Sequence, residues 1–199
     1  MSPASGRCPQ RARVGLAVGS ALLAVAGCGS ADGSTGSTEG FVSSNRTITV
    51  VPVAERQPAP ELTGLDLQGK QLSSADLRGD DGILVVNVWG SWCAPCRREA
   101  PVLADASRRY AKQGVAFVGL LSRDKPAAAS AFARRFDMTY PSLQDPGGRL
   151  QLRFADTLAS QGIPTTWIID RKGRVAVRVL AEVTKGTLHG LIDDELART

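Results

Sequence analysis

The sequence predicts an α/β domain in which a central mixed sheet is flanked by helices, with a short β extension on its N-terminal side. Two continuous apolar runs, at residues 83–89 and 115–121, are each followed by residues with helical periodicity. Two further strand-like segments and a closing helix occupy residues 165–197. Strands that alternate with helices favour parallel pairing, whereas strands joined by a tight turn pair antiparallel, so the sheet should be mixed.

The segment before the first buried strand contains short β-like and helical signals. Residues 47–51 are rich in β-branched side chains, but Pro52 interrupts them, so they fit an edge strand or an extended arm. The folded domain is expected to span residues 58–199. Its first elements are two short strands within 61–72, which surround a turn at Gln68-Gly69-Lys70, and a helical turn at 73–79.

The central strand is predicted at residues 83–89. Its run Ile83-Leu84-Val85-Val86-Asn87-Val88 is almost entirely apolar, which is typical of a strand buried on both faces. A helix is predicted over residues 94–113, and Pro101 inside it should cause a kink. A second buried strand at 115–121 and a helix at 126–136 repeat the pattern.

The C-terminal part is expected to begin with a turn and to end with a helix. Its predicted elements are a turn at 145–148, a short helix at 149–154, strands at 165–170 and 174–180, a hairpin turn at 170–173, and a helix at 184–197 capped by Thr184. No strand is predicted between residues 137 and 164.

The most informative stretch is Trp89-Gly90-Ser91-Trp92-Cys93-Ala94-Pro95-Cys96, because two cysteines lie where a buried strand ends and a helix begins. The first turn of a helix has unpaired N–H groups and a partial positive charge, which favour a thiolate. Such a cysteine can have its pKa lowered from about 8.5 to roughly 3.5–7.5. We expect Cys93, the outer cysteine facing solvent, to attack a substrate and Cys96, about one turn further on, to resolve the intermediate.

A pair of cysteines at this spacing can also be half of a metal site. A structural zinc site needs about four protein ligands. The chain has no second pair of this kind, and its only histidine is His189, which we expect at the surface of the last helix. No metal is therefore expected.

Further motifs occur in order with the cysteine pair between residues 58 and 197. They are Asp76-Leu77-Arg78-Gly79, Trp89-x-x-Trp92-Cys93-x-Pro95-Cys96, Pro101 and Gly162-Ile163-Pro164-Thr165-Thr166. Together they resemble the TlpA/ResA type of membrane-tethered thiol-disulfide oxidoreductases, in the thioredoxin superfamily. The resemblance implies a thioredoxin-like fold and a redox-active disulfide between Cys93 and Cys96, with no other cofactor.

The same resemblance implies a substrate-docking site. About 5–6% of X-Pro bonds are cis, so Pro164 alone would be expected to be trans. The matching proline of the superfamily is cis, packs beside the cysteines, blocks metal binding and offers backbone groups to the substrate. Trp92, Pro95 and Ile163 are expected to bind substrate with Pro164, while Trp89 or Trp92 packs under the site. Ile163 before Pro164 resembles thioredoxin more than the strong oxidants, which favours reduction.

Glu99 is a further candidate for the chemistry. It lies three residues after Cys96 on the predicted helix, where an ordinary solvated carboxylate is the alternative. In ResA-like proteins a glutamate at this position tunes the thiols. Thioredoxin carries a buried aspartate six residues before the first cysteine, whereas this chain has Asn87, which cannot titrate. Glu99 is then the nearest carboxylate able to move a proton for Cys96.

Residues 1–27 predict a lipoprotein signal peptide. Arg7, Arg11 and Arg13 precede an apolar stretch, 14–26, that is shorter than the ~20 residues of a membrane span. The ending Val25-Ala26-Gly27-Cys28 resembles a bacterial lipobox, in which Cys28 receives the lipid. Ordinary cleavage after small residues, with Cys28 incidental, is the alternative.

The segment 28–57 is expected to be the lipidated cysteine and a flexible tether. Nine of the twelve residues in 29–40 are Gly, Ser or Thr. More than one acyl chain on Cys28 would anchor the protein stably to the outer face of the cytoplasmic membrane. Removal of the first 27 residues would also remove Cys8 and reduce the net charge from +5 to +2, which gives no basis for nucleic-acid binding.

These observations predict an exported, membrane-anchored thiol-disulfide oxidoreductase. The resemblance implies a reductase of exported protein disulfides, with apocytochrome c as one substrate, that is recharged by a membrane thiol-disulfide electron carrier. A disulfide-forming oxidant is the nearest alternative. A copper chaperone is another, although such relatives use CxxxC with a distal histidine. A peroxidase would need a Pro-x-x-x-Thr-x-x-Cys motif, which is absent, and a scaffold that only binds would not need both cysteines.

Overall fold

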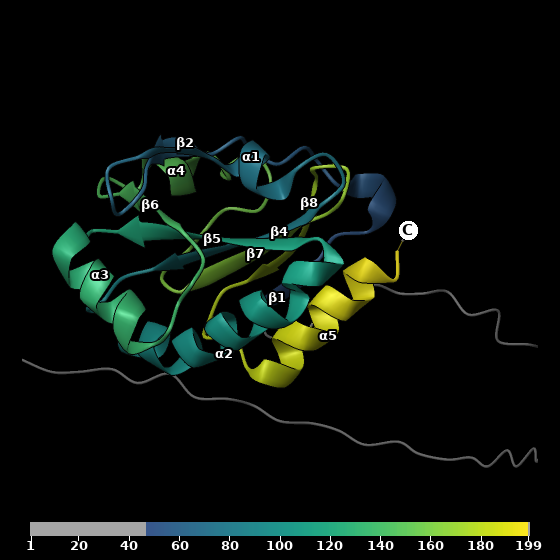
Figure 1. Ribbon diagram of the computed structural model, residues 1–199. Coiled ribbons are helices and arrows are strands. Elements are labelled where there is room, and N and C mark those ends of the chain that lie inside the picture. Colours follow the sequence, from purple (N-terminus) through teal and green to yellow (C-terminus); the bar gives the residue numbers. More distant parts are fainter. Residues whose placement is uncertain (1–46, 199) are drawn as a thin grey trace, which may run out of the picture. The chain divides into compact units, whose positions relative to one another are not determined.

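The computed structural model describes residues 47–198 and is shown in Figure 1. The strands are β1 (Ile48–Val50), β2 (Thr63–Leu65), β3 (Gln71–Ser73), β4 (Ile83–Trp89), β5 (Val115–Ser122), β6 (Ser142–Asp145), β7 (Thr165–Ile169) and β8 (Val175–Val179). The helices are α1 (Ser74–Arg78), α2 (Ala94–Tyr110), α3 (Pro126–Arg135), α4 (Arg149–Leu152) and α5 (Lys185–Leu196), with 3-10 turns η1 (Val53–Glu55) and η2 (Ala111–Gln113).

The main sheet is mixed, as the sequence predicts. Its six strands follow the order β1-β8-β7-β4-β5-β6. Strand β4 pairs parallel with β5, and β5 pairs parallel with β6, whereas β7 runs antiparallel to both β4 and β8. Strands β2 and β3 form a separate antiparallel hairpin. The predicted α/β architecture, with helices around a central mixed sheet, is therefore confirmed.

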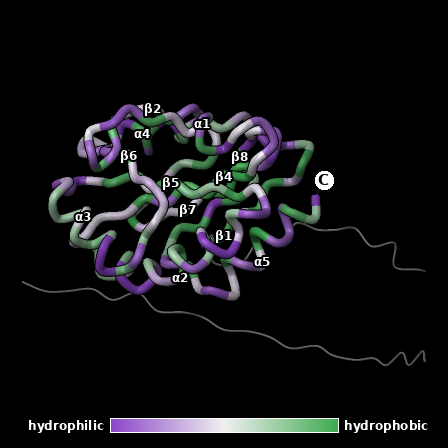
Figure 2. Tube along the Cα trace, viewed as in Figure 1, coloured by the Kyte–Doolittle hydropathy of each residue, from purple (hydrophilic) through white to green (hydrophobic). Residues whose placement is uncertain are grey.

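Strand β4 lies at the centre of the core because its side chains are apolar on both faces. All seven of its residues are buried. Alternate residues contribute to two apolar clusters: Ile83 and Val85 pack on the side of α2 and α5, and Leu84 and Val86 pack on the opposite side. Figure 1 shows α2 and α5 together on one face, with α1, α4 and β2 across the sheet, and Figure 2 shows apolar residues concentrated in the strands between them.

The order of the strands brings three loops to one edge of the sheet. Parallel strands β4 and β5 end there, and antiparallel β7 begins there, with Val88 opposite Thr165. The loop after β4 contains the cysteine pair, the loop after β5 begins at Arg123, and Pro164 comes just before β7. Functional side chains from distant parts of the chain therefore meet at this edge.

The folded domain begins earlier than the expected boundary at residue 58. Strand β1 pairs antiparallel with β8, with Ile48 opposite Val179, so the predicted edge strand is part of the main sheet. The backbone N–H of Val51 donates to Ala176, which continues this pairing. Residues 48–57, expected in the tether, thus belong to the sheet and its border.

A buried ion cluster fixes the end of this segment. The Arg56 guanidinium contacts Glu195 of α5 at 2.7 Å and Asp170, just after β7, at 3.1 Å. All three side chains are nearly inaccessible to solvent. A buried charge is tolerated only when it is paired and hydrogen-bonded, so this cluster ties the N-terminal segment to the folded domain.

Strand β6 is the one strand of the main sheet that the sequence did not predict. It pairs parallel with β5 at the edge of the sheet, with Leu143 opposite Leu120. The segment Ser142-Leu143-Gln144-Asp145 has a single apolar residue, so its sequence alone does not indicate a strand. The remaining predicted helices and strands are present, and Thr184 caps α5 by accepting from the N–H of Thr187.

Candidate active site

The predicted cysteine pair forms a disulfide at the N-terminus of α2. Cys93 is the N-cap residue, and its Sγ accepts a hydrogen bond from the backbone N–H of Cys96 at 3.2 Å. The Cα atoms of the two cysteines lie 5.2 Å apart. Pro95 occupies the first turn, where a missing N–H removes no helical hydrogen bond. The positive end of the helix therefore points at the sulfur of Cys93.

Solvent exposure does not distinguish the two cysteines in the disulfide form. Cys93 is 3% exposed and Cys96 is 2% exposed, so the expectation that Cys93 faces solvent is wrong for this form. Both pack in an apolar cluster with Trp89, Ala100 and Leu121. The position of Cys93 at the helix N-terminus is what sets it apart from Cys96.

The two tryptophans of the motif have different places. Trp89, at the end of β4, is buried beneath the site and donates its Nε1–H to Ser142 of β6 at 3.2 Å. Gly119 allows this close approach, because a Cβ there would lie 2.5 Å from the Trp89 nitrogen. Trp92 is 47% exposed. One tryptophan thus supports the site from below, and the other is available at the surface, as the sequence predicts.

The exposed ring of Trp92 is fixed by the loop that follows β5. Its Nε1–H donates to the carbonyl of Ser122 at 3.3 Å, and the Arg123 guanidinium lies 5.3 Å from the ring centroid. The backbone N–H of Ser91 donates to the Asp124 carboxylate at 2.6 Å. These contacts fix Ser91 and Trp92, the two residues before Cys93, against the end of β5.

Glu99 is buried in the core rather than solvated, and is 1% exposed. Its Oε1 accepts from the side-chain amide of Asn87 at 2.9 Å, and its Oε2 accepts from the backbone N–H of Val183 at 3.0 Å. The same amide nitrogen of Asn87 also donates to Thr166 at 3.1 Å. The carboxylate therefore connects α2 to β4 and to the loop between β8 and α5.

Burial raises the pKa of Glu99 to about 7, because desolvation penalises the carboxylate more than its hydrogen bonds stabilise it. The negative charge of Glu182 raises the pKa further. The hydrogen bonds from Asn87 and Val183 act in the opposite direction. A carboxyl group with this pKa exchanges protons readily near neutral pH, which an ordinary glutamate does not.

Ile163 and Pro164 border the cysteine pair from the other side of the site. The peptide bond between them is cis. Ile163 packs against the cluster that contains both cysteines. With Pro95, these residues line a groove of about 540 Å³ that we call the β8-side groove; the residues that complete it are Thr47, Arg98, Gln161, Gly162, Leu180, Ala181 and Glu182.

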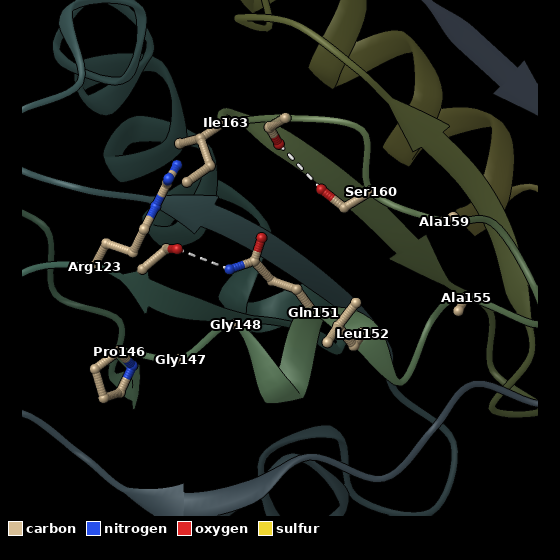
Figure 3. Close-up of a pocket in the computed structure, with 12 residues that line it drawn as sticks. Arg123, Pro146, Gly147, Gly148, Gln151, Leu152, Ala155, Ala159, Ser160 and Ile163 are labelled. Carbon is tan, nitrogen blue, oxygen red and sulfur yellow. Dashed lines mark hydrogen bonds between the residues drawn. The ribbon is translucent and has the colours of Figure 1, made fainter.

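A second groove lies on the opposite side of Ile163, toward the end of β5, and has a volume of about 340 Å³. We call it the β5-side groove, and Figure 3 shows it with Arg123 and Gln151 among its lining residues. Gly162 and Ile163 line both grooves. The two grooves therefore adjoin the same short segment before Pro164.

Some of the residues in the site were not predicted from the sequence. Val183 contributes only a backbone N–H, so its residue type carries no signal. Arg123 lies far from the cysteine pair in the sequence, and the order of the strands brings it to the site. Thr166 belongs to the motif at 162–166, but its hydrogen bond with Asn87 was not predicted. His189, expected at the surface, is half-buried, and its ring lies edge-on to Tyr110 at 5.4 Å.

Within residues 47–198, no three His, Cys, Asp or Glu side chains gather in a way that could hold a metal ion. None of the helices in this range has the length and apolarity of a membrane span. Cys28, the predicted lipidation site, lies outside the described residues.

The fold and the site together define a class of protein. A disulfide at a helix N-terminus, beside a cis-proline loop and on a thioredoxin-like sheet, is the site of a thiol-disulfide oxidoreductase. The chain belongs to the AhpC/TSA family, whose model matches residues 56–178.

Curated relatives of the chain are named for the same activity. A thiol-disulfide oxidoreductase ResA of Bacillus cereus is 31% identical over 134 residues, which cover 67% of this chain and 74% of that protein. This similarity confirms the resemblance to ResA-type proteins that the motifs predict. The protein is thus a thiol-disulfide oxidoreductase.

Solved structures confirm the fold. A DsbF homologue from Corynebacterium diphtheriae matches with a TM-score of 0.69 and 32% identity, covering 76% of this chain and 95% of that chain. A secreted thiol-disulfide isomerase from Corynebacterium glutamicum matches with a TM-score of 0.63 and 26% identity, covering 78% and 93%.

Proposed function

We propose that this protein reduces disulfides of exported proteins, with Cys93 as nucleophile and Cys96 as resolving cysteine. The observation that carries the proposal is the position of Cys93, whose sulfur caps α2 and accepts the N–H of Cys96. A sulfur in this position is stabilised as a thiolate by the helix dipole and by the hydrogen bond. The nearly equal burial of both cysteines gives no competing reason to choose Cys96.

The proposed reaction is two successive thiol-disulfide exchanges. The Cys93 thiolate attacks one sulfur of the substrate disulfide, and the other substrate sulfur leaves as a thiolate that takes up a proton. The Cys96 thiolate then attacks Cys93, forms the intramolecular disulfide and releases the second substrate sulfur, which is also protonated. The substrate gains two electrons and two protons, and the cysteine pair loses them.

Glu99 is proposed to hold the proton that Cys96 releases. Cys96 must lose its proton before it can attack, and Glu99 lies one helical turn further along α2 in a water-poor environment. Because its pKa is about 7, the carboxylate can accept a proton and return it near neutral pH. Asn87 cannot do this, since an amide does not titrate, but its hydrogen bond positions the carboxylate.

The docking surface is proposed to consist of Trp92, Pro95, Ile163 and Pro164. Trp92 offers an exposed ring, and the other three residues line the β8-side groove beside the disulfide. Charges in that groove are balanced, because Arg98 and Glu182 form an ion pair. The redox centre is the disulfide itself, and the proposed reaction uses no further cofactor.

The proposed location is the outer face of the cytoplasmic membrane, with Cys28 lipidated and residues 1–27 removed. The lipobox-like sequence supports the anchor, and the relative described as secreted supports export. A membrane thiol-disulfide electron carrier would reduce the pair after each turnover, and apocytochrome c is one proposed substrate. Partition of wild type into a detergent phase, with loss of partition in Cys28→Ala, tests the anchor; equal partition of both would contradict it.

The direction of the reaction is tested by equilibrating the pair with glutathione or dithiothreitol buffers of known potential. A reductase is expected to have a potential near that of thioredoxin, about −270 mV, whereas a strong oxidant lies near −120 mV. The reduced protein should also reduce a disulfide-bonded polypeptide, and Cys93→Ser should not. A potential near the oxidant value would favour the disulfide-forming alternative.

A further inference from the structure

The β5-side groove contains a single charged side chain. It is lined by Ser122, Arg123, Pro146, Gly147, Gly148, Gln151, Leu152, Ala155, Ala159, Ser160, Gly162 and Ile163. Most of these residues are apolar or small, and Leu152 is 69% exposed. Among the described residues that line this groove, the guanidinium of Arg123 is therefore the only formal charge.

Arg123 is held in place without a carboxylate partner. It comes directly after β5, with a positive φ of 49° that residues other than glycine seldom adopt. Its guanidinium lies over the Trp92 ring, and no ion pair satisfies it among residues 47–198. The neighbouring carboxylate, Asp124, is instead occupied by the backbone N–H groups of Ser91 and Lys125.

Polar groups on the floor of the groove are already paired with one another. The side-chain amide of Gln151 donates to Ser122 at 2.9 Å, and Ser160 donates to the carbonyl of Gly162 at 3.0 Å. In Figure 3 the Arg123 side chain extends from the end of β5 toward Ile163, above the bond between Gln151 and Ser122. Arg123 thus remains the group with unused donors that point toward an incoming ligand.

The groove continues to the disulfide through Ile163, which lines both grooves and packs against the cysteine cluster. A polypeptide whose disulfide reaches Cys93 would pass Ile163 and place its neighbouring residues in one groove or the other. In the β8-side groove the positive charge of Arg98 is balanced by Glu182. Of the two grooves, the β5-side groove is therefore the one whose described lining carries an unbalanced charge.

We propose that Arg123 is a specificity-determining residue, which selects substrate polypeptides that carry an acidic side chain, next to an apolar one, beside the cysteine under attack. This inference rests on the proposed function. The Trp92 ring and Leu152 receive the apolar part of such a segment, and the guanidinium pairs with its carboxylate. Lysine at the same substrate position is disfavoured, because like charges repel and because the groove offers no acidic group.

The test measures second-order rate constants for reduction of paired disulfide peptides by the reduced full-length protein. The two peptides of a pair differ at one position, which is glutamate in one and lysine in the other. One set of pairs has this position before the reactive cysteine, and a second set has it after. At low salt the glutamate peptide should react roughly threefold to tenfold faster, since an exposed ion pair contributes up to about 1 kcal/mol and the matched repulsion adds to the difference. The preference should shrink as salt is added.

Variants then assign the preference to Arg123. Arg123→Gln should bring the ratio of the two rate constants to about one, and Arg123→Lys should keep most of it. Lys112→Gln, an exposed cation in η2, makes the same change in net charge and should leave the ratio unchanged. A ratio near one in wild type, or a ratio that survives in Arg123→Gln, would overturn the inference.

A further assay distinguishes a failure of this inference from a failure of the proposed function. Wild-type protein is also assayed with bis(2-hydroxyethyl) disulfide, which is small and uncharged. If wild type reduces this compound, and reduces the glutamate and lysine peptides at rates that do not differ, the selectivity of Arg123 is refuted while the oxidoreductase chemistry stands. If it reduces neither the small disulfide nor any peptide, the proposed reductase function itself fails.

Discussion

Replacement of Glu99 by glutamine should make protein stability less sensitive to pH. Glu99 has an unfolded pKa near 4.5, and burial raises the folded pKa to about 7. Between these values the folded protein keeps the proton and the unfolded chain has lost it, so the free energy of unfolding falls as pH rises. The stabilising effect of the neutral carboxyl is complete below pH 4.5 and is lost as pH rises through about 7.

The size of the effect follows from this shift. A shift from 4.5 to about 7 corresponds to about 3 kcal/mol, at 1.36 kcal/mol for each pH unit. Glutamine has the same size but does not titrate. The free energy of unfolding of wild type, minus that of Glu99→Gln, should therefore decrease by about 3 kcal/mol between about pH 4 and pH 8. The NH₂ group of glutamine would face the N–H donor of either Asn87 or Val183, so one of these hydrogen bonds is lost. This loss lowers the free energy of unfolding of Glu99→Gln by an amount that does not depend on pH.

Chemical denaturation over this pH range, with the Cys93–Cys96 disulfide intact, measures the difference. Glu55→Gln is the matched control, because Glu55 is exposed in η1 and its replacement should produce no comparable slope. The rate of disulfide exchange should show an inflection near pH 7 in wild type that is absent in Glu99→Gln. A stability difference that stays flat with pH would show that Glu99 does not titrate in this window, and would refute its proposed role as proton holder.

Two further substitutions test the buried ion cluster and the docking surface. Arg56→Ala removes the guanidinium at 2.7 Å from the buried carboxylate of Glu195, which keeps only Arg198 at 3.6 Å, whereas Asp170 still pairs with Arg174. The loss of this pairing at Glu195 should lower the free energy of unfolding by roughly 3–5 kcal/mol; a loss below about 1 kcal/mol in chemical denaturation would contradict this expectation. Trp92→Ala removes a half-exposed ring beside the site, so it should reduce the rate with polypeptide disulfides by roughly tenfold, and by a smaller factor with a small disulfide. Equal losses with both substrates, measured by stopped-flow kinetics, would argue against a docking role for Trp92.

The parts of the fold with strong local signals could be predicted from the sequence. The apolar run of β4, the helical spacing after Cys96 and the turn at 170–173 each depend on neighbouring residues, and each appears in the structure. The cysteine pair could be placed at a helix N-terminus for the same reason. Local patterns of this kind predict the structure correctly because packing of the core favours the same elements as the pattern.

The elements that were missed depend on residues far apart in the chain. Strand β6 has only Leu143 as an apolar residue and becomes a strand because β5 offers it a parallel edge. Arg56 looks like an ordinary polar residue of a tether, yet its partners lie 114 and 139 residues later. Pairings of this range follow from the order of the strands, which the local sequence does not encode.

Glu99 shows the same limit inside the candidate site. A glutamate between Arg98 and Ala100 could face solvent or core, and the choice depends on where Asn87 and Val183 lie. The resemblance to ResA-like proteins indicated a role in tuning the thiols, whereas the position of Glu99 on the helix did not distinguish that role from an ordinary solvated carboxylate. Exposure of Cys93 was predicted from its place before the helix, but the apolar cluster around Trp89 covers it in the disulfide form.

Cys93, at the N-terminus of α2, is proposed to attack the substrate, and Cys96 is proposed to resolve the intermediate. The most direct measurement incubates Cys96→Ser with a disulfide-bonded peptide and locates the adduct by mass spectrometry. One peptide should be bound to Cys93 in a stable mixed disulfide, because no thiol remains to release it. Absence of an adduct with Cys96→Ser, together with a stable adduct on Cys96 in Cys93→Ser, would contradict this assignment.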